Sequence, residues 1–183
     1  MQFIENLKTK IGTYMLKSSL QKRSKMAFIP GFDELKEIAI IYPADNKKDE
    51  NDANQLAIHL REQGKKVMLL GFVNQKQLSH QYKFHISHEY FWRETLDTFL
   101  LPKKEKIAGF IQHPYDLLIN LYTDFNLQLA AISAFSKASI RVGANYPEAA
   151  HYNEILIDGK FNSLFELGLN MEHYLKILKH QSE

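Results

Sequence analysis

Hydrophobic and polar positions follow two different periods along this chain, and the two periods alternate. Continuous apolar runs are typical of buried parallel strands, and they occupy residues 36–43, 65–73, 115–122, 139–142 and 154–158. Between and after these runs, apolar residues recur every three or four positions, as expected for amphipathic helices, at residues 53–60, 124–135 and 164–178. This order predicts a three-layer, Rossmann-like α/β domain with a mostly parallel sheet of about five or six strands.

The middle of the chain is less regular. Residues 83–89 fit a further short strand, residues 92–101 an irregular loop, and residues 103–112 a short helix. Five aromatic residues gather here, and they either line a ligand pocket or dimer contact or, as is more common, cover the core beneath a long loop. They are Tyr82, Phe84, Tyr90, Phe91 and Trp92.

The first 20 residues predict an additional amphipathic helix. Their apolar residues recur at helical spacing, namely Phe3, Ile4, Leu7, Ile11, Tyr14 and Met15. The turn signal Pro30-Gly31 separates this helix from the rest of the chain. We therefore expect an N-terminal basic amphipathic helix within residues 1–25 and a single Rossmann-like α/β domain over residues 26–183.

Charge is unevenly distributed between these two parts. Residues 1–25 contain six basic residues and one acidic residue, a net charge of +5, which leaves −3 for the remainder of a chain whose total is +2. A slightly acidic body argues against a nucleic-acid partner. Helices of this kind most commonly pack on their own domain. The basic flanks of this helix also suit a protein partner or a second copy, and a peripheral membrane contact is the less favoured alternative.

Composition narrows the class of protein. A length of 183 residues with 45% hydrophobic and 24% charged residues is typical of one globular domain. The sequence has no cysteine, which excludes disulfides, thiol catalysis and Cys-containing metal sites. No apolar run reaches the roughly 18 residues of a membrane-spanning helix, and the N-terminus lacks the apolar core of a signal peptide. We expect a cytoplasmic protein.

Several catalytic and cofactor motifs are missing. The sequence contains no GxGxxG, no GxxxxGK[ST], no GxSxG and no HExxH, so neither a Rossmann cofactor, a P-loop nucleotide, an α/β-hydrolase nor a zincin site is expected. The densest histidine cluster is His85 and His88, which point to opposite faces if they lie on one strand. The sequence therefore predicts no cofactor, no metal site and no catalytic residue.

Polar residues do follow the predicted strands where parallel sheets bind ligands. If the strand order reverses between the first and fourth strands, the strand ends converge on one crevice. An acid there is able to hold a cation or act as a base, and an arginine to bind an anion. The alternative assigns Asp45 and Asn46 to a turn, Asp124 to a helix cap and Arg141 to a surface ion pair. The candidates are Asp45, Asn46, Asn120, Thr123, Asp124 and Arg141.

One segment resembles a known family. Residues 115–144 contain Tyr115-Asp116-Leu117-Leu118-Ile119, a short polar turn, an Ala/Leu-rich helix, then Ser136-Lys137-Ala138 and Arg141-Val142-Gly143. This order resembles a segment in the N-terminal, acceptor-side half of the heptosyltransferases of lipopolysaccharide assembly. The resemblance implies a glycosyltransferase-like domain that binds a sugar or a phosphorylated metabolite. In length and pattern the chain is also similar to an uncharacterised bacterial family of single α/β domains.

These observations lead to two hypotheses on function. The missing motifs and the local positive charge favour a non-enzymatic α/β domain that mediates protein or self association through its N-terminal helix. The alternative is a small-ligand or glycosyltransferase-like domain with its site at the carboxyl ends of the strands.

Overall fold

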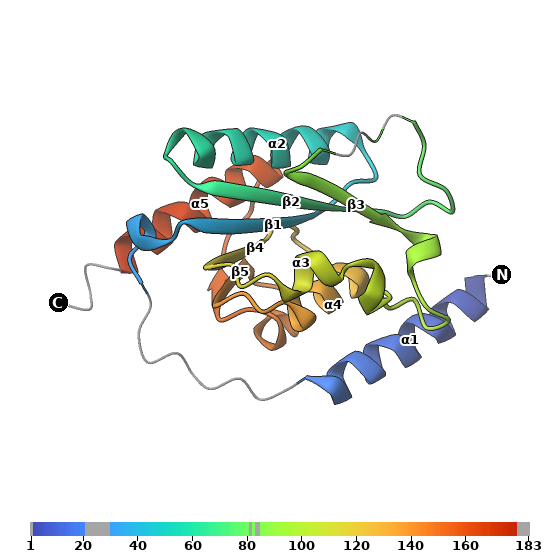
Figure 1. Cartoon of the computed structure of the whole chain (residues 1–183). Helices are drawn as coiled ribbons and strands as arrows, with labels where there is room; N and C mark the ends of the chain where they lie inside the picture. Colours follow the sequence, from blue (N-terminus) through green and yellow to red (C-terminus); the bar gives the residue numbers. More distant parts are fainter. Residues whose placement is uncertain (1, 21–29, 81, 83–84, 179–183) are drawn as a thin grey trace.

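Six parallel strands form one sheet in the spatial order β3-β2-β1-β4-β5-β6 (Figure 1). This computed structural model describes residues 2–20, 30–80, 82 and 85–178. The strands are β1 (Glu37–Pro43), β2 (Lys66–Val73), β3 (His88–Trp92), β4 (Leu117–Asn120), β5 (Ile140–Ala144) and β6 (Ile155–Ile157). The predicted α/β class is confirmed, and every pairing among these six strands is parallel.

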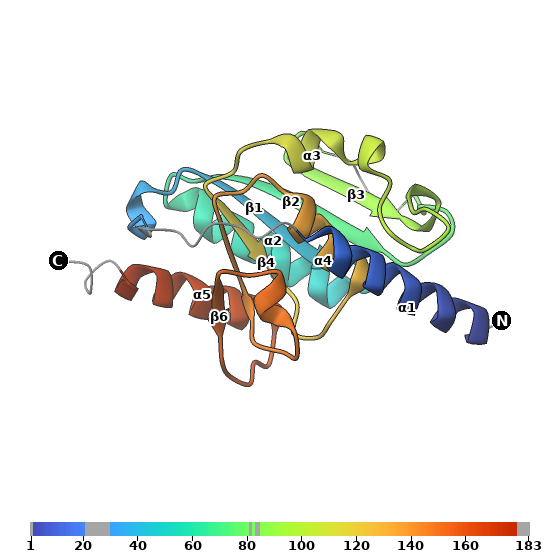
Figure 2. The ribbon, with the colours of Figure 1, turned by 90° about the horizontal axis from the view of Figure 1, so that it is seen from below.

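Helices cover both faces of the sheet. One face carries α2 (Lys47–Glu62) and α5 (Leu164–Leu178), and the other carries α3 (Ala108–Gln112) and α4 (Leu127–Phe135) (Figure 1). The N-terminal helix α1 (Gln2–Ser19) lies beside α4 on the outside of the second layer (Figure 2). The three layers and the added N-terminal helix agree with the sequence.

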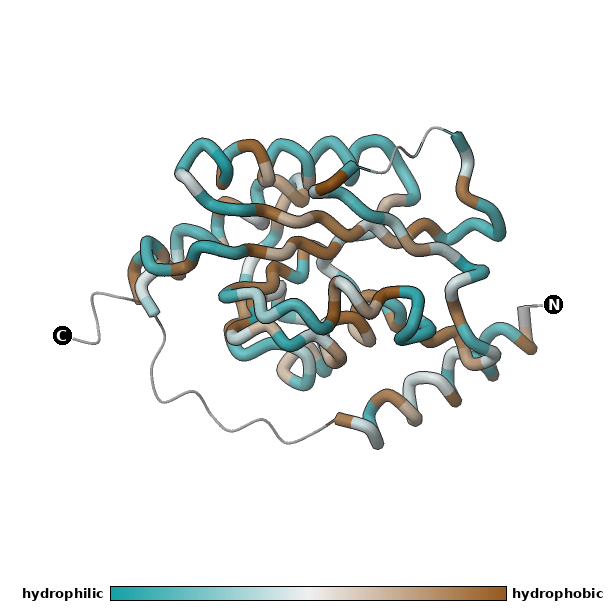
Figure 3. Tube along the Cα trace, in the orientation of Figure 1, coloured by the Kyte–Doolittle hydropathy of each residue, from teal (hydrophilic) through white to brown (hydrophobic). Residues whose placement is uncertain are grey.

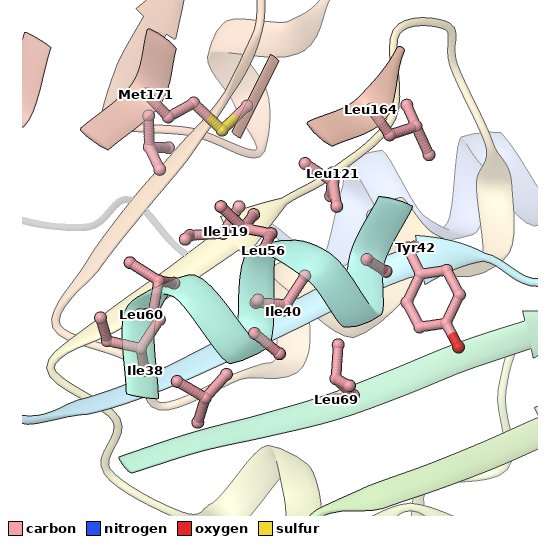
Figure 4. Packing of buried hydrophobic residues seen from close by; sticks show 14 of the residues in the cluster. Ile38, Ile40, Tyr42, Leu56, Leu60, Leu69, Ile119, Leu121, Leu164 and Met171 are labelled. Atoms are coloured by element: carbon pink, nitrogen blue, oxygen red, sulfur yellow. The ribbon is translucent and has the colours of Figure 1, made fainter. Parts of the chain in front are cut away.

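The central strand β1 is apolar on both sides because both sides are covered. Ile38 and Ile40 point toward α2, where they join the same core cluster as Leu56 (Figure 4). Ala39 and Ile41 belong to the cluster on the α3 and α4 side. A strand buried on both faces appears in the sequence as an unbroken apolar run, and hydrophobic residues accordingly concentrate along the strands (Figure 3).

Several predicted boundaries are wrong, and three of them show the causes. The third strand begins at His88 rather than at residue 83, because His85 and His88 form an antiparallel bridge that turns the chain just before it. The fourth strand ends at Asn120, although the next two residues are still buried. Helix α4 begins at Leu127 and not near Asp124, because Asn126 is the residue whose side chain accepts the backbone N–H of Leu129, at 3.0 Å.

Candidate functional site

Helix α1 carries apolar side chains on the side that faces away from the body. Phe3 is 79% exposed, Tyr14 74% and Ile4 59%. Isolated exposed apolar residues are ordinary on protein surfaces, whereas a contiguous patch marks an interaction site. We call this patch the outer stripe; its six residues are Phe3, Ile4, Leu7, Ile11, Tyr14 and Met15.

The opposite side of α1 packs against the body. Leu16 is fully buried in a cluster that includes Leu127 of α4 and Tyr152. Gly12 lies close against the body, since a Cβ added there would be only 2.2 Å from the backbone carbonyl oxygen of Phe99. The helix is therefore held by one face while the outer stripe remains in solvent.

Ion pairs connect the two halves of α1 to the body. Near the N-terminal end, the guanidinium of Arg93 donates to the carboxylate of Glu5. Near the C-terminal end, Lys17 Nζ donates to Glu148 Oε1 at 2.5 Å. Exposed pairs of this kind contribute about 0 to 1 kcal/mol each, so they fix the position of α1 more than they stabilise it.

A chain of hydrogen bonds links Glu5 to the carboxyl ends of the strands. Asp45 follows β1, and its carboxylate accepts the backbone N–H of Asn74 at 2.6 Å. Asn74 follows β2, and its side-chain carbonyl accepts from Arg93 Nε at 2.7 Å. A cavity of about 240 Å³ lies beside Arg93, with Glu5 and Gln128 among its lining residues. The loops after β1, β2 and β3 thus meet α1 at one edge of the sheet.

Two residues of this edge were not predicted from the sequence. Asn74 directly follows the predicted second strand, so the reasoning that selected Asp45 also applies to it. Arg93 directly follows β3, and it was missed because that strand was placed several residues too early.

Asn46 takes a local role at the start of α2. Its side-chain oxygen accepts the backbone N–H of Asp49 at 2.9 Å, and its amide nitrogen donates to the Asp49 carboxylate at 2.7 Å. This is an N-cap, whereas the alternative drawn from the sequence assigned this residue to a turn.

Asn120 lies deep between β4 and α4, only 1% exposed. Its amide nitrogen donates to Ser133 Oγ at 2.9 Å and to Asn153 Oδ1 at 2.5 Å. Asn153 lies over Gly143, where an added Cβ would be 2.5 Å from the Asn153 oxygen. Gly143 is the β5 neighbour of Asn120 in the sheet, so the glycine makes room for this buried amide pair.

Arg141 is also buried, 5% exposed, on the same face of the sheet. Its guanidinium donates to both carboxylate oxygens of Glu154, at 3.1 and 2.5 Å, and to the backbone carbonyl of Ser133 at 3.0 Å. This two-pronged geometry is the preferred one for arginine and a carboxylate. Arg141 and Asn120 therefore meet at Ser133.

Thr123 and Asp124 are exposed on the loop between β4 and α4. The Thr123 hydroxyl donates to the Asp124 carboxylate at 3.0 Å. The six predicted residues thus divide between the carboxyl edge of the sheet, the cap of α2, a buried network and an exposed loop. The structure brings Asn120 together with Arg141 and leaves Asp45 and Asn46 in separate local roles. A ligand-binding function for the six remains a prediction.

On the α2 side of the sheet, buried aromatic residues form a hydrogen-bonded cluster. The Tyr42 hydroxyl is 2.6 Å from His88 Nε2, and the Tyr90 hydroxyl donates to Glu50 at 2.5 Å. The His88 ring stacks on Tyr90 with 4.5 Å between centroids. Burial lowers the pKa of His88 to about 4 and raises the pKa values of Tyr42 and Tyr90. Burial thus favours the uncharged forms of these three rings near pH 7.

Of the aromatic residues singled out in the sequence, Tyr82, Tyr90 and Phe91 are buried in the core clusters. Trp92 is partly buried and packs against one of these clusters. Phe84 lies outside the described residues. For these four the core alternative agrees with the structure.

A comparison with protein-family models gives a match over residues 8–178, which is most of the chain. The chain belongs to a family of unknown function, DUF6913. Neither a search of curated proteins nor a search of solved structures gives a match. The similarity to an uncharacterised family is thereby confirmed, and the match does not bear on the heptosyltransferase resemblance of residues 115–144.

The DUF6913 match begins inside α1, at Lys8, and ends at Leu178, the last residue of α5. It includes Gly12 and Leu16, through which α1 packs on the body. The part of this DUF6913 chain that the structure describes holds no helix long and apolar enough to cross a membrane. The same residues contain no group of three or more His, Asp or Glu side chains placed to hold a metal ion.

Proposed function

We propose that this chain is a non-enzymatic association domain that inserts the outer stripe of α1 into an apolar groove on a partner protein. The observation that carries the proposal is the two-sided character of α1. Its inner side packs on the body through Gly12 and Leu16, so the exposed apolar residues do not contribute to the protein's own core. A held helix with an unpartnered apolar face suits a docking role.

The spacing of the outer stripe fits a helix that lies in a groove. Ile4, Leu7, Ile11 and Tyr14 fall at positions i, i+3, i+7 and i+10, the pattern by which helices anchor in hydrophobic grooves. The helix is already formed and docked in the free chain. Little conformational entropy is then lost on binding, which favours affinity.

Charge defines the chemistry of the partner. Lys8 and Lys10 are on α1 beside the outer stripe, and the only acid of that helix, Glu5, is paired with Arg93. We therefore infer a groove with an acidic rim. Two copies of α1 placed side by side would bring their lysines together without an available acid, which disfavours self-association.

A lipid surface is the less suitable occupant of the outer stripe. Helices that bind anionic membranes rely on clusters of about four to eight basic residues. Lys17 of α1 is engaged by Glu148, so Lys8 and Lys10 remain within the helix.

The test combines a crosslinker with matched substitutions in the whole chain. A photo-crosslinking residue at position 7 is expected to give an adduct with one protein in cells that contain the chain. That protein is then purified and its Kd measured directly. The double variant Leu7→Asp/Ile11→Asp is expected to weaken binding at least about tenfold, because both side chains are desolvated in the groove. The control is Ile58→Asp/Ile86→Asp, which alters two apolar residues elsewhere that are more exposed than Leu7 and Ile11.

Other outcomes contradict the proposal and identify the occupant. A concentration-dependent dimer in analytical ultracentrifugation that the double variant abolishes indicates a second copy. Co-sedimentation with phosphatidylglycerol vesicles indicates a lipid surface. A monomer that gives no adduct and does not bind vesicles leaves the outer stripe without a docking function.

The cavity beside Arg93 favours a second candidate function, the small-ligand site suggested by the heptosyltransferase resemblance. It lies at the carboxyl edge of the strands, where open α/β sheets bind ligands. A ligand at 100 times its Kd stabilises a protein by about 2.7 kcal/mol, so a thermal-shift screen of sugars and sugar nucleotides is a sensitive test. A shift that Arg93→Gln removes supports this candidate, and a flat screen contradicts it.

A further inference from the structure

A cavity away from the carboxyl edge is lined by basic residues. It has a volume of about 310 Å³ and lies between the C-terminal end of α1, helix α3 and the end of α4. Four basic side chains line it, Lys104, Lys137, Arg141 and His151. No acidic residue lines it among the described residues. Its volume falls in the range of small-molecule sites, which is roughly 300 to 1,000 Å³.

The four basic residues differ in what they have available for a ligand. Arg141 is bound to Glu154 and to the Ser133 carbonyl, so it forms a rigid wall of the cavity and its charge is balanced. Lys104 and Lys137 form no ion pair with the described residues. The net positive charge of the cavity therefore resides mainly on these two ammonium groups.

An apolar wall lies next to the lysines. Phe135 and Ile111 line the cavity, and Lys104 Nζ lies 4.3 Å from the centroid of the Phe135 ring. This cation–π contact holds the ammonium beside the cavity. A ligand that fits has a compact apolar or ring-shaped body and an anionic group directed at the lysines.

We propose that this cavity binds a small organic phosphate, with the phosphate group against Lys104 and Lys137 and the organic part against Phe135. A phosphate monoester carries about two negative charges near neutral pH, which matches two lysines better than a single carboxylate does. Lysine is a regular phosphate ligand. The proposal is independent of the docking role of the outer stripe, because it concerns other residues.

The experiment is an NMR titration of the whole chain with three probes of known chemistry: inorganic phosphate, phenyl phosphate and benzoate. Phenyl phosphate is expected to bind most tightly and to shift amide signals around Ile111 and Phe135. Lys104→Gln and Lys137→Gln are each expected to weaken phenyl phosphate binding about tenfold. The matched control is Lys160→Gln, which removes the same charge from an exposed loop outside the cavity and should leave the affinity unchanged.

Four results would overturn the inference. The first is no saturable shift up to about 10 mM phenyl phosphate, because a Kd above that value is too weak for a specific site of this kind. The second is equal affinity for benzoate, and the third is equal weakening by Lys160→Gln, which would indicate general charge screening. The fourth is a set of shifts that map beside Arg93 instead of around the cavity. Melting temperatures of the variants show whether they are folded. Because the altered lysines are exposed, a loss of binding at an unchanged melting temperature supports the cavity.

Discussion

At the scale of single residues, the buried polar groups are explained by partners that are distant in the sequence. The sequence singles out Asn120 and Arg141 because they lie at or near the ends of predicted strands. In the structure both belong to one buried hydrogen-bond network. Their partners Asn153 and Glu154 come from the segment before β6. Periodicity indicates which face a residue occupies but not which side chain from another element meets it. The sequence alone therefore could not predict which of the six candidates are buried together and which have local roles.

Arg141→Gln is expected to lower the free energy of unfolding, independently of any ligand. The substitution removes the guanidinium that donates to the Glu154 carboxylate and to the Ser133 carbonyl. Only the backbone N–H of residue 141, at 2.8 Å, still donates to that carboxylate. Breaking a buried pair costs about 3 to 5 kcal/mol, and the partial exposure of Glu154 reduces our expectation to about 2 kcal/mol. Urea denaturation measures it. Asp124→Asn, on the exposed loop, is the comparison and should stay within about 0.5 kcal/mol of the parent.

His88 should make the stability of the chain depend on pH. The folded state keeps its ring neutral down to a pKa of about 4, whereas the unfolded chain takes up the proton near 6.5. The unfolded state thus binds more protons between these values, and stability falls as the pH falls from about 6.5 to about 4.

His88→Gln is expected to reduce this dependence. The loss of stability between pH 7 and pH 5 should become smaller by about 1 kcal/mol, with allowance for the partial exposure of the ring. Denaturation midpoints at both pH values measure the difference. Equal pH dependence in parent and variant would show that His88 is not the responsible group.

At the scale of elements, local signals located most helices and strands. Helix α5 has the predicted limits. Helix α2 ends at Glu62, and Gly64, with φ of 79°, turns the chain just after it. The errors arose where two signals compete. Asp124 and Asn126 are both acceptable caps, and only the path of the chain after β4 decides that Asn126 reaches the first turn.

Helix α1 offers a test in which helix propensity and packing oppose each other. Gly12→Ala should stabilise an isolated helix by about 1 kcal/mol. In the folded chain the new Cβ meets the Phe99 carbonyl, so we expect α1 to dock less tightly and its amides to lose protection in hydrogen exchange. Gly109→Ala in α3 is the control, because nothing lies within 4 Å of its added Cβ. Increased protection of α1 in Gly12→Ala would contradict this account of its packing.

At the scale of the whole molecule, the strand order follows from rules that act on any α/β chain. All neighbouring strands are parallel, and the strand order reverses between β1 and β4. The sequence predicts a crevice at this reversal. The layers were predictable because continuous apolar runs require cover on both faces. The outer position of α1 was not predictable, because its apolar spacing suits an inner and an outer helix equally well.

The outer stripe affects which substitutions the fold of this chain tolerates. Polar residues at positions 4, 7 and 11 would fit the same backbone and leave the packing of Gly12 and Leu16 intact, so folding alone exerts no selection for apolar side chains there. Random substitution would replace them with hydrophilic residues. Under the proposed docking role, selection for binding would instead retain apolar side chains at these positions.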